Sequence, residues 1–202
     1  MNKIYCDMDG VLVDFLSGAV QRMNEILHDP PDEFMVEAAA VAARLGRPYV
    51  VKQDLEKYTD NACPEARNFM YRALEDDEEF WANLPWMPGG AQLWEYLKDF
   101  NPTILTSPMD KGGKLGSLAG KRRWIKKNIG LDNIEGLVFE HNKYEYALDD
   151  DGNPNVLIDD FMAKIGPWRE AGGIGIHHPD ANAPETIAAL EALENVPQPA
   201  NT

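Results

Sequence analysis

Short apolar runs alternate with amphipathic segments along most of the chain. Five runs lack the polar alternation of a half-exposed strand and therefore predict buried strands. These runs cover residues 4–6, 103–105, 137–139, 156–158 and 173–176. Because helical segments lie between most of the later runs, the pattern predicts an α/β fold in which helices cover both faces of a doubly wound parallel sheet.

Apolar residues at helical spacing predict the helices. The predicted helices cover residues 16–27, 34–45, 64–74, 91–98, 121–129, 163–171 and 184–193. Between Phe15 and Asn83 only the run 49–51 is ambiguous, and no regularly alternating strand is expected there. The sequence therefore predicts a helical cap inserted after the first strand.

The predicted domain limits follow from this pattern. The α/β core takes residues 1–14 and 84–195, the helical cap takes 15–83, and 196–202 form a loose tail. Within the cap, the acidic run 75–79 is expected to be a solvated face or a linker. The stretch that follows is dense in aromatic residues, proline and glycine, and it is expected to return the chain to the core.

Composition and charge narrow the classes of partner. The 202 residues suit one domain with an insert, and 44% of them are apolar, enough for a sizeable core. The 34 acidic and 19 basic residues give a net charge of −15, which argues against a nucleic-acid duplex or an anionic membrane. A small phosphorylated substrate remains compatible if a metal, a lysine or helix N-termini supply local positive charge.

Cysteine usage and the chain's N-terminus indicate a compartment. Cys6 and Cys63 lack the spacing of a zinc site and are expected to be free thiols in a reducing environment. No charged-then-apolar signal sequence begins the chain, and no apolar stretch approaches the length of a membrane span. A cytoplasmic protein is therefore expected, with no prediction of its oligomeric state.

Acidic residues follow the first predicted strand directly. Asp7 and Asp9 are one residue apart, Gly10 follows, and Asp14 is close behind. Asp and Gly are also ordinary turn residues, so this fragment alone is compatible with a solvated turn. At the carboxyl edge of an α/β sheet, however, two neighbouring carboxylates need a cation or a shared proton to coexist, and Mg²⁺ is the hard ion that prefers oxygen ligands.

Two other predicted strands end in chemically useful residues. Thr106 and Ser107 follow the strand 103–105, and Asp159 and Asp160 follow the strand 156–158. Taken singly, these are an ordinary strand exit and an ordinary helix cap. At one sheet edge together, they would supply hydrogen bonds to a phosphate and a further metal ligand.

Lys143, just after the strand 137–139, is the best candidate to neutralise a phosphate. Lys121 competes for this role, but it begins a helix with apolar Trp124 and Ile125, so it is expected to be mainly structural or to support the residues that contact the substrate. Two loops are rejected on spacing: 149–154 as a calcium loop, because Pro154 stands where glycine is needed, and 116–122 as a phosphate-binding loop. Both are interpreted as surface loops, and the pair His177-His178 as structural.

These motifs resemble those of the haloacid dehalogenase (HAD) superfamily in order and in position at strand ends. That resemblance implies a Rossmann-like core with a cap. A closer resemblance is to the 5′(3′)-deoxyribonucleotidases (5′-nucleotidase, deoxy, C type). It is carried by residues 7–15, Phe80-Trp81 with Pro88-Gly89, Thr106-Ser107-Pro108, 121–124 and 157–160.

The resemblance implies a role for each acid. Asp7 resembles the nucleophile and Asp9 the general acid and base. Mg²⁺ would be held by the Asp7 carboxylate, the Asp9 backbone carbonyl and an acid of the Asp159-Asp160 pair. Asp160 is expected to bind it directly, because the single metal-binding Asp of related motifs aligns with the second position.

The same resemblance extends to the substrate. Thr106 and Ser107 resemble phosphate-binding residues, and Phe15 resembles the aromatic residue that stacks on the base. The predicted enzyme is therefore a Mg²⁺-dependent phosphoric monoester hydrolase that acts on (deoxy)ribonucleoside monophosphates through an aspartyl-phosphate. Phe161 and the glycine-rich loop 111–120 depart from the family pattern, and both bear on the substrate more than on the reaction.

Two alternatives stand beside this prediction. The same machinery could act on another small phosphorylated metabolite. The chain could also be a non-catalytic Mg²⁺-binding or partner-binding module. Asp9 counts against the second alternative, because a pure binder has no use for a second acid beside the first.

Overall fold

The computed structural model describes residues 3–56, 62–110, 113 and 115–194. Residues 196–202, the predicted loose tail, lie outside this range, as do Lys111, Gly112 and Lys114 of the glycine-rich loop. The chain forms two compact units. The sheet unit comprises Met1–Val13, Trp86–Ser107 and Gly130–Thr202, and the helical unit comprises Asp14–Pro85 and Pro108–Ile129.

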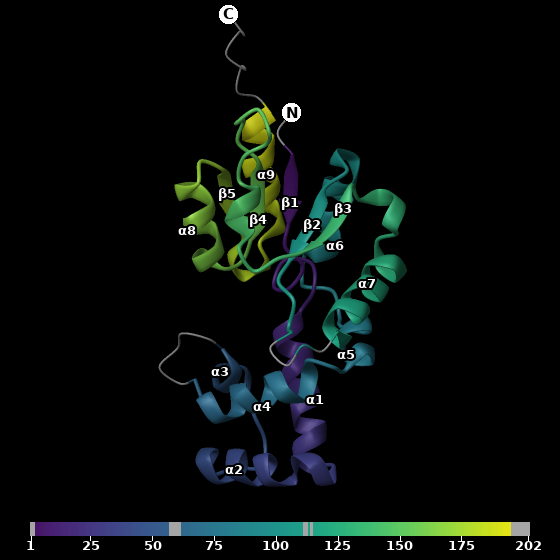
Figure 1. The fold of residues 1–202 in the computed structure, drawn as a ribbon, viewed down its shortest axis with the longest axis vertical. Coiled ribbons are helices and arrows are strands. Elements are labelled where there is room, and N and C mark those ends of the chain that lie inside the picture. Colours follow the sequence, from purple (N-terminus) through teal and green to yellow (C-terminus); the bar gives the residue numbers. More distant parts are fainter. Residues whose placement is uncertain (1–2, 57–61, 111–112, 114, 195–202) are drawn as a thin grey trace, which may run out of the picture. The chain divides into compact units, whose positions relative to one another are not determined.

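A five-stranded sheet forms the centre of the sheet unit (Figure 1). Its strands are β1 (Ile4–Cys6), β2 (Thr103–Thr106), β3 (Gly136–Phe139), β4 (Val156–Asp159) and β5 (Ile174–His177). Their order is β3-β2-β1-β4-β5, and every neighbouring pair is parallel. All five predicted strands are present within one or two residues, which confirms the α/β prediction.

Helices cover both faces of this sheet. On one face, α8 (Met162–Glu170) and the 3-10 helix η4 (Lys143–Tyr146) contribute to a core around three strand residues, Tyr5, Leu105 and Leu157. On the opposite face, Cys6 and Ile104 are fully buried, and α6 (Gly90–Leu97) packs against α9 (Ala183–Glu194), behind the sheet in Figure 1. The remaining elements of this unit are the 3-10 helices η2 (Lys98–Phe100), η3 (Leu131–Asn133) and η5 (Pro179–Ala181).

The helical unit contains no strand among its described residues. Its helices are α1 (Phe15–His28), α2 (Met35–Leu45), α3 (Lys52–Leu55), α4 (Pro64–Leu74), α5 (Glu78–Ala82) and α7 (Gly116–Asn128), with the 3-10 helix η1 (Asp32–Phe34). Gly46 ends α2 in the left-handed conformation, at φ 67°, and Pro64 begins α4, both as predicted. The ambiguous run 49–51 is not a strand, and α3 follows it.

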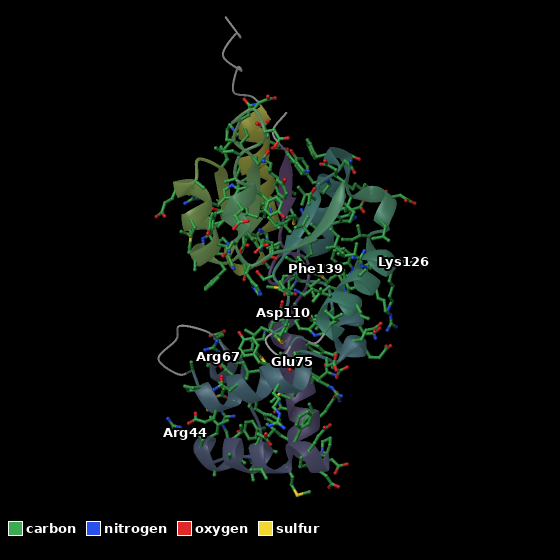
Figure 2. All side chains as sticks on the ribbon, in the orientation of Figure 1. Arg44, Arg67, Glu75, Asp110, Lys126 and Phe139 are labelled. Carbon is green, nitrogen blue, oxygen red and sulfur yellow. The ribbon has the colours of Figure 1, made fainter. Side chains whose placement is uncertain are left out.

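Helix α7 begins earlier than its sequence suggests. The prediction started it at Lys121, but it starts at Gly116, so the supposed surface loop 116–122 is its first two turns. The reason is close packing on α5. A Cβ at Gly120 would lie 2.4 Å from the Cβ of Trp81, so only glycine fits there. The sequence-based limits assigned 108–129 to the α/β core, whereas here this segment belongs to the helical unit. Lys126 of α7 is exposed (Figure 2).

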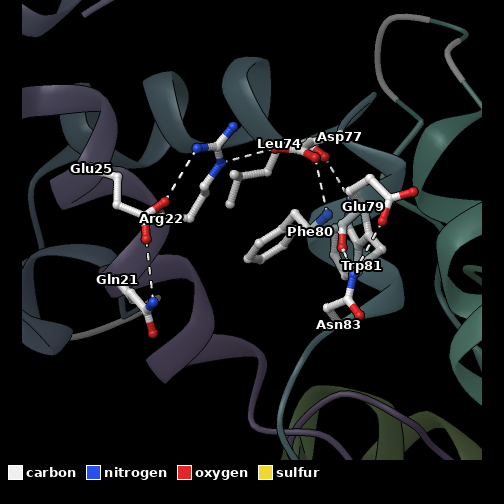
Figure 3. A network of polar contacts seen from close by, with 9 residues as sticks. All are labelled: Gln21, Arg22, Glu25, Leu74, Asp77, Glu79, Phe80, Trp81 and Asn83. Atoms are coloured by element: carbon white, nitrogen blue, oxygen red, sulfur yellow. Dashed lines mark hydrogen bonds and ion pairs between the residues drawn. The ribbon is translucent and has the colours of Figure 1, made fainter. Parts of the chain in front are cut away.

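The acidic run 75–79 is not the simple solvated face that was predicted. Glu75 is 7% exposed (Figure 2). Asp77 caps α5 by accepting the Phe80 N–H at 3.0 Å, and it also accepts the Arg22 Nε–H at 2.9 Å (Figure 3). Charge density alone suggested solvent, but Glu75 is buried and Asp77 is held by capping and ion pairing, while Asp76 and Glu79 are exposed.

Candidate active site

The register of β1 against β4 sets two acids side by side. Tyr5 pairs with Leu157 and Cys6 with Ile158, so the next residue on each strand is an aspartate, Asp7 or Asp159. The Asp7 N–H continues the ladder by donating to the Ile158 carbonyl at 2.9 Å. Both acids therefore stand at the carboxyl edge of the sheet, between its two central strands, where open α/β sheets bind ligands.

Three acids of this edge form a carboxylate cluster, consisting of Asp7, Asp159 and Asp160. Each offers one oxygen, and these oxygens all lie within 4.8 Å of one another. Asp9 is close enough for its charge to act on Asp160. The structure thus brings together the acids that were predicted from separate strands.

Lys143 is the cation beside this cluster. Its Nζ lies 2.8 Å from Asp7 Oδ1 and 2.7 Å from Asp159 Oδ2, and its side chain is 1% exposed. Lys143 is the first residue of η4 and is positioned by the packing of this helix. Tyr146, the last residue of η4, and the following Ala147 pack into the core on the sheet face that carries Tyr5. Burial disfavours the ammonium, but the charges of Asp7 and Asp159 outweigh burial and raise the pKa of Lys143. Lys143 is therefore charged in the neutral pH range.

The two oxygens of Asp7 differ in their surroundings. Oδ1 accepts the Met8 N–H at 2.7 Å as well as the Lys143 ammonium. No described residue donates a hydrogen bond to Oδ2. Asp7 is therefore fixed through one oxygen, which leaves the other available for attack or for metal binding.

Asp159 and Asp160 also differ. Asp159 is fully buried, and both of its oxygens are engaged, Oδ2 by Lys143 and Oδ1 by the Phe161 N–H at 2.9 Å. Burial and the charge of Asp7 raise the pKa of Asp159 to about 6, although Lys143 opposes the shift. Asp160 is exposed, and no described residue donates a hydrogen bond to its carboxylate.

The pKa of Asp160 is raised to about 8, by desolvation first and then by the charges of Asp7, Asp159 and Asp9. The Asp160 side chain is exposed, so solvent reduces the effect of desolvation, while the charges of Asp7, Asp159 and Asp9 still oppose ionisation of Asp160. A divalent cation would offset the repulsion among these carboxylates.

Gly10 shapes the turn beneath Asp160. Its φ is +80°, and a Cβ there would lie 2.2 Å from Asp160 Oδ2. The turn is closed by the Gly10 N–H, which donates to the Val13 carbonyl at 2.8 Å, and by the Leu12 and Val13 N–H groups on the Met8 carbonyl. Glycine is required both by its φ and by the approach of Asp160. The glycine that follows Asp9 in the sequence motif is therefore required on steric grounds.

The residues present fit Mg²⁺. The cluster supplies carboxylate oxygens, which are the hard donors that this ion prefers. Asp159 already uses both oxygens on Lys143 and Phe161, whereas Asp7 and Asp160 each keep acceptor capacity. Asp160, the direct ligand expected from the family resemblance, is thus the acid of the pair whose carboxylate no described residue engages.

The predicted phosphate-binding residues lie at the end of the strand next to β1. Thr106 is the last residue of β2 and is fully buried. Its carbonyl accepts the Glu140 N–H at 3.0 Å, and the Ser107 hydroxyl donates to the Glu140 carbonyl at 3.2 Å. The two residues therefore share the sheet edge with Asp7.

Phe15 belongs to the helical unit, at the start of α1. Its ring stacks on Trp81, with centroids 5.1 Å apart and an 11° interplanar angle, and it meets the Phe80 ring edge-on at 6.1 Å. One face of the ring is thus occupied by another aromatic residue. Lys121, the competitor of Lys143, is also in this unit, fully buried, with Nζ 5.0 Å from the Trp81 ring centroid.

Sequence reasoning missed the contact that His177 makes with this site. Its Nε2 lies 2.9 Å from the Asp160 carbonyl oxygen. The neighbouring His178 is fully buried, with Nδ1 2.6 Å from the Thr186 hydroxyl, so the two rings have different partners. Nothing in the sequence reveals that β5 lies beside β4, which is why the contact could not be foreseen.

The rejected calcium loop is a hydrogen-bonded turn, in which Asp149 accepts the Asp151 and Asn153 N–H groups.

Within the described parts of the chain, no helix is long and apolar enough to cross a membrane.

No family model matches the sequence, and no curated protein matches it. Solved structures do match. A haloacid dehalogenase-like family hydrolase from Streptococcus pneumoniae has a TM-score of 0.53 and 14% identity, over 94% of this chain and 98% of its own.

A second similar structure is the HAD-hydrolase YfnB from Bacillus subtilis bound to magnesium, with a TM-score of 0.51 and 12% identity, over 96% of this chain and 99% of its own. A dehalogenase has a TM-score of 0.50 and 16% identity, over 96% of both chains. At such identities the likeness concerns the fold: this chain has the α/β fold of haloacid dehalogenase-like hydrolases.

Proposed function

We propose that the protein is a Mg²⁺-dependent phosphatase that hydrolyses phosphate monoesters through an aspartyl-phosphate. One observation carries the proposal. A carboxylate with one oxygen fixed by a buried ammonium and the other available stands at the carboxyl edge of the sheet, within 4.8 Å of two further carboxylates. A nucleophile and a site for a divalent cation are thereby combined.

In the proposed reaction, Asp7 Oδ2 attacks phosphorus in line, and the bond to the leaving oxygen breaks. Asp9 gives its proton to the leaving oxygen and so releases the alcohol. Asp9 then takes a proton from water, and the water oxygen attacks phosphorus, which releases phosphate and restores the Asp7 carboxylate. Bound Mg²⁺ would supply positive charge for the phosphoryl oxygens.

The other residues position these groups. Lys143 holds Asp7 and Asp159 together and offsets their charge. Asp160 is proposed to bind Mg²⁺ directly together with Asp7 and the Asp9 carbonyl, while Asp159 orients Lys143. Thr106 and Ser107 are proposed to donate hydrogen bonds to the phosphate, as hydroxyl groups at the same sheet edge.

Nucleoside monophosphates are the leading substrate class, and the basis is the resemblance to deoxyribonucleotidases. Phe15 is proposed to stack on the base, an interaction that contributes about 1–3 kcal/mol per base in single-strand sites. Phe15→Ala should then raise KM for a nucleoside monophosphate and leave hydrolysis of a small generic phosphate ester nearly unchanged. Equal losses on both would make Phe15 structural.

The test of the proposed function is a phosphate-release screen over nucleoside monophosphates and sugar phosphates with Mg²⁺. Release that needs Mg²⁺ and is lost in Asp7→Asn supports the proposal. Preference for sugar phosphates would move the substrate to another small phosphorylated metabolite. Hydrolysis of no phosphate ester, with Mg²⁺ binding retained, would favour a binding module.

A further inference from the structure

The end of β5 carries two histidines that the proposed reaction does not use. The His177 ring approaches the backbone of Asp160, with Nε2 2.9 Å from the carbonyl oxygen. Because a carbonyl only accepts hydrogen bonds, Nε2 must carry the proton and donate. The partner of His177 is therefore the main chain of the residue whose carboxylate is proposed to bind the cation.

Neighbouring bonds tie the exit of β4 to the same end of β5. His177 pairs with Asp159 in the strand register, and the His178 N–H donates to the Asp159 carbonyl at 3.0 Å. The Phe161 N–H bonds to the side chain of Asp159 at 2.9 Å. The residues on either side of Asp160 are thus held, and its own carbonyl is held by His177.

The ring of His178 anchors this arrangement. It is fully buried, and its Nδ1 lies 2.6 Å from the hydroxyl of Thr186 on α9. A fixed His178 helps to hold the backbone of the preceding residue beside β4, where His177 pairs with Asp159.

The carboxylate of Asp160 accepts no hydrogen bond from any described residue, so its position depends on the backbone of Asp160 and on rotation of its own side chain. Each peptide plane at Asp160 can rotate unless a partner fixes it. The bond from His177 fixes the plane that contains the Asp160 carbonyl. Groups that orient metal ligands typically change metal affinity by about 10–100-fold when they are removed.

We propose that His177 is a positioning residue for the cation site: its Nε2–H bond to the Asp160 carbonyl holds the Asp160 carboxylate in the direction required for a divalent cation. This role rests on the proposed function. His177 is not proposed as a ligand, because among the described residues the side chains placed to share an ion here are those of Asp7, Asp159 and Asp160.

The test is a Mn²⁺ titration of the full chain, followed by the electron paramagnetic resonance signal of free Mn²⁺. His177→Phe keeps an aromatic ring on the strand but loses the donor, whereas His177→Gln places an amide N–H near the position of Nε2. His28→Ala, at the exposed end of α1 in the helical unit, serves as the matched control. Thermal unfolding of each variant confirms that it is folded.

The expected result is a rise of about tenfold in the Kd for Mn²⁺ in His177→Phe, with most of the affinity regained in His177→Gln and none lost in His28→Ala. The catalytic rate of His177→Phe should return close to that of the wild type at saturating Mg²⁺, which a misfolded site would not show. Equal affinity in the wild type and His177→Phe would overturn the role of His177 alone. Absence of Mn²⁺ binding in the wild type would overturn the proposed metal dependence, and the role of His177 with it.

Discussion

Two lysines are almost completely buried, one in each unit, and their surroundings differ. Lys143 lies between two carboxylates in the sheet unit, whereas Lys121 lies over the indole ring of Trp81 in the helical unit. The ion pairs of Lys143 hold two carboxylates at the carboxyl edge of the sheet, whereas Lys121 is not paired with either of them. Burial of a charge therefore does not by itself indicate a catalytic position; the place of the groups that the charge holds does.

The largest expected effect comes from replacing Asp7, one of the two carboxylates that are paired with Lys143. Asp7→Asn should lower the rate of phosphate release on the order of 10⁴-fold or more, because an amide is a poor nucleophile. Its near-isosteric side chain should leave the fold intact, which circular dichroism checks. Substantial remaining turnover would exclude Asp7 as the nucleophile.

Replacing each lysine in turn tests the comparison directly. Lys143→Met should lower the rate by about 10²–10³-fold and destabilise the metal-free protein by about 3–5 kcal/mol, because it leaves two buried carboxylates without a countercharge. Lys121→Met keeps a long side chain on the indole and should cause little loss of rate, because Lys143 and not Lys121 is paired with Asp7 and Asp159.

Steady-state kinetics and chemical denaturation measure both quantities for these two variants. If Lys121→Met loses more activity than Lys143→Met, the roles of the two lysines are reversed. In that case the competition left open by the sequence would be decided for Lys121.

The acids beside Lys143 should differ in their effect on metal binding. Asp160→Asn should raise the Mg²⁺ concentration for half-maximal rate by more than Asp159→Asn does, with a difference of about tenfold. The reason is that Asp159 already uses both oxygens on Lys143 and Phe161. Mg²⁺ titrations of the rate that rank the two variants in the opposite order would make Asp159 the ligand.

The smallest effect is a dependence of thermal stability on pH in the metal-free protein. The pKa of Asp160 is about 8 in the folded chain, against 3.8 for the ordinary carboxyl, so ionisation costs folding free energy. The contribution of protonated Asp160 to the free energy of unfolding is fully present below the ordinary pKa and is lost as the pH rises through about 8. Tm measured in a chelator should therefore rise as pH falls from about 9 to about 6.

Asp160→Asn should flatten this dependence of Tm on pH, and Mg²⁺ should flatten it in the wild type, because the cation replaces the proton. The dependence should persist in Lys121→Met, whose site in the helical unit contains no such cluster among its described residues. A wild-type slope that Asp160→Asn leaves unchanged would assign the effect to other acids.

The sheet and its acids could be predicted because they depend on local pattern. Ile4–Cys6 and Val156–Asp159 are apolar runs that end in carboxylates, and parallel strands bring their carboxyl ends to one edge. The sequence predicted Lys143 as the residue that neutralises a phosphate, but its pairing with Asp7 and Asp159 was not predicted, because that pairing depends on the packing of η4.

What could not be predicted depends on neighbours that are distant in sequence. The early start of α7 depends on the fit of Gly120 against Trp81, and the sequence alone presents those glycines as a loop. The contact of His177 with Asp160 requires that β5 lie beside β4. Packing and strand order, rather than local propensity, decided both.

The most direct test of the central claim is whether Asp7 becomes phosphorylated. The protein is mixed with Mg²⁺ and a nucleoside monophosphate, quenched in acid during turnover, and analysed by peptide mass spectrometry, with Asp7→Asn in parallel. If Asp7 is the nucleophile, the peptide that contains Asp7 should gain the mass of one phosphoryl group, and the same peptide of the variant should not. Turnover without that mass, or the same mass on another residue, would contradict the claim that Asp7 is the nucleophile.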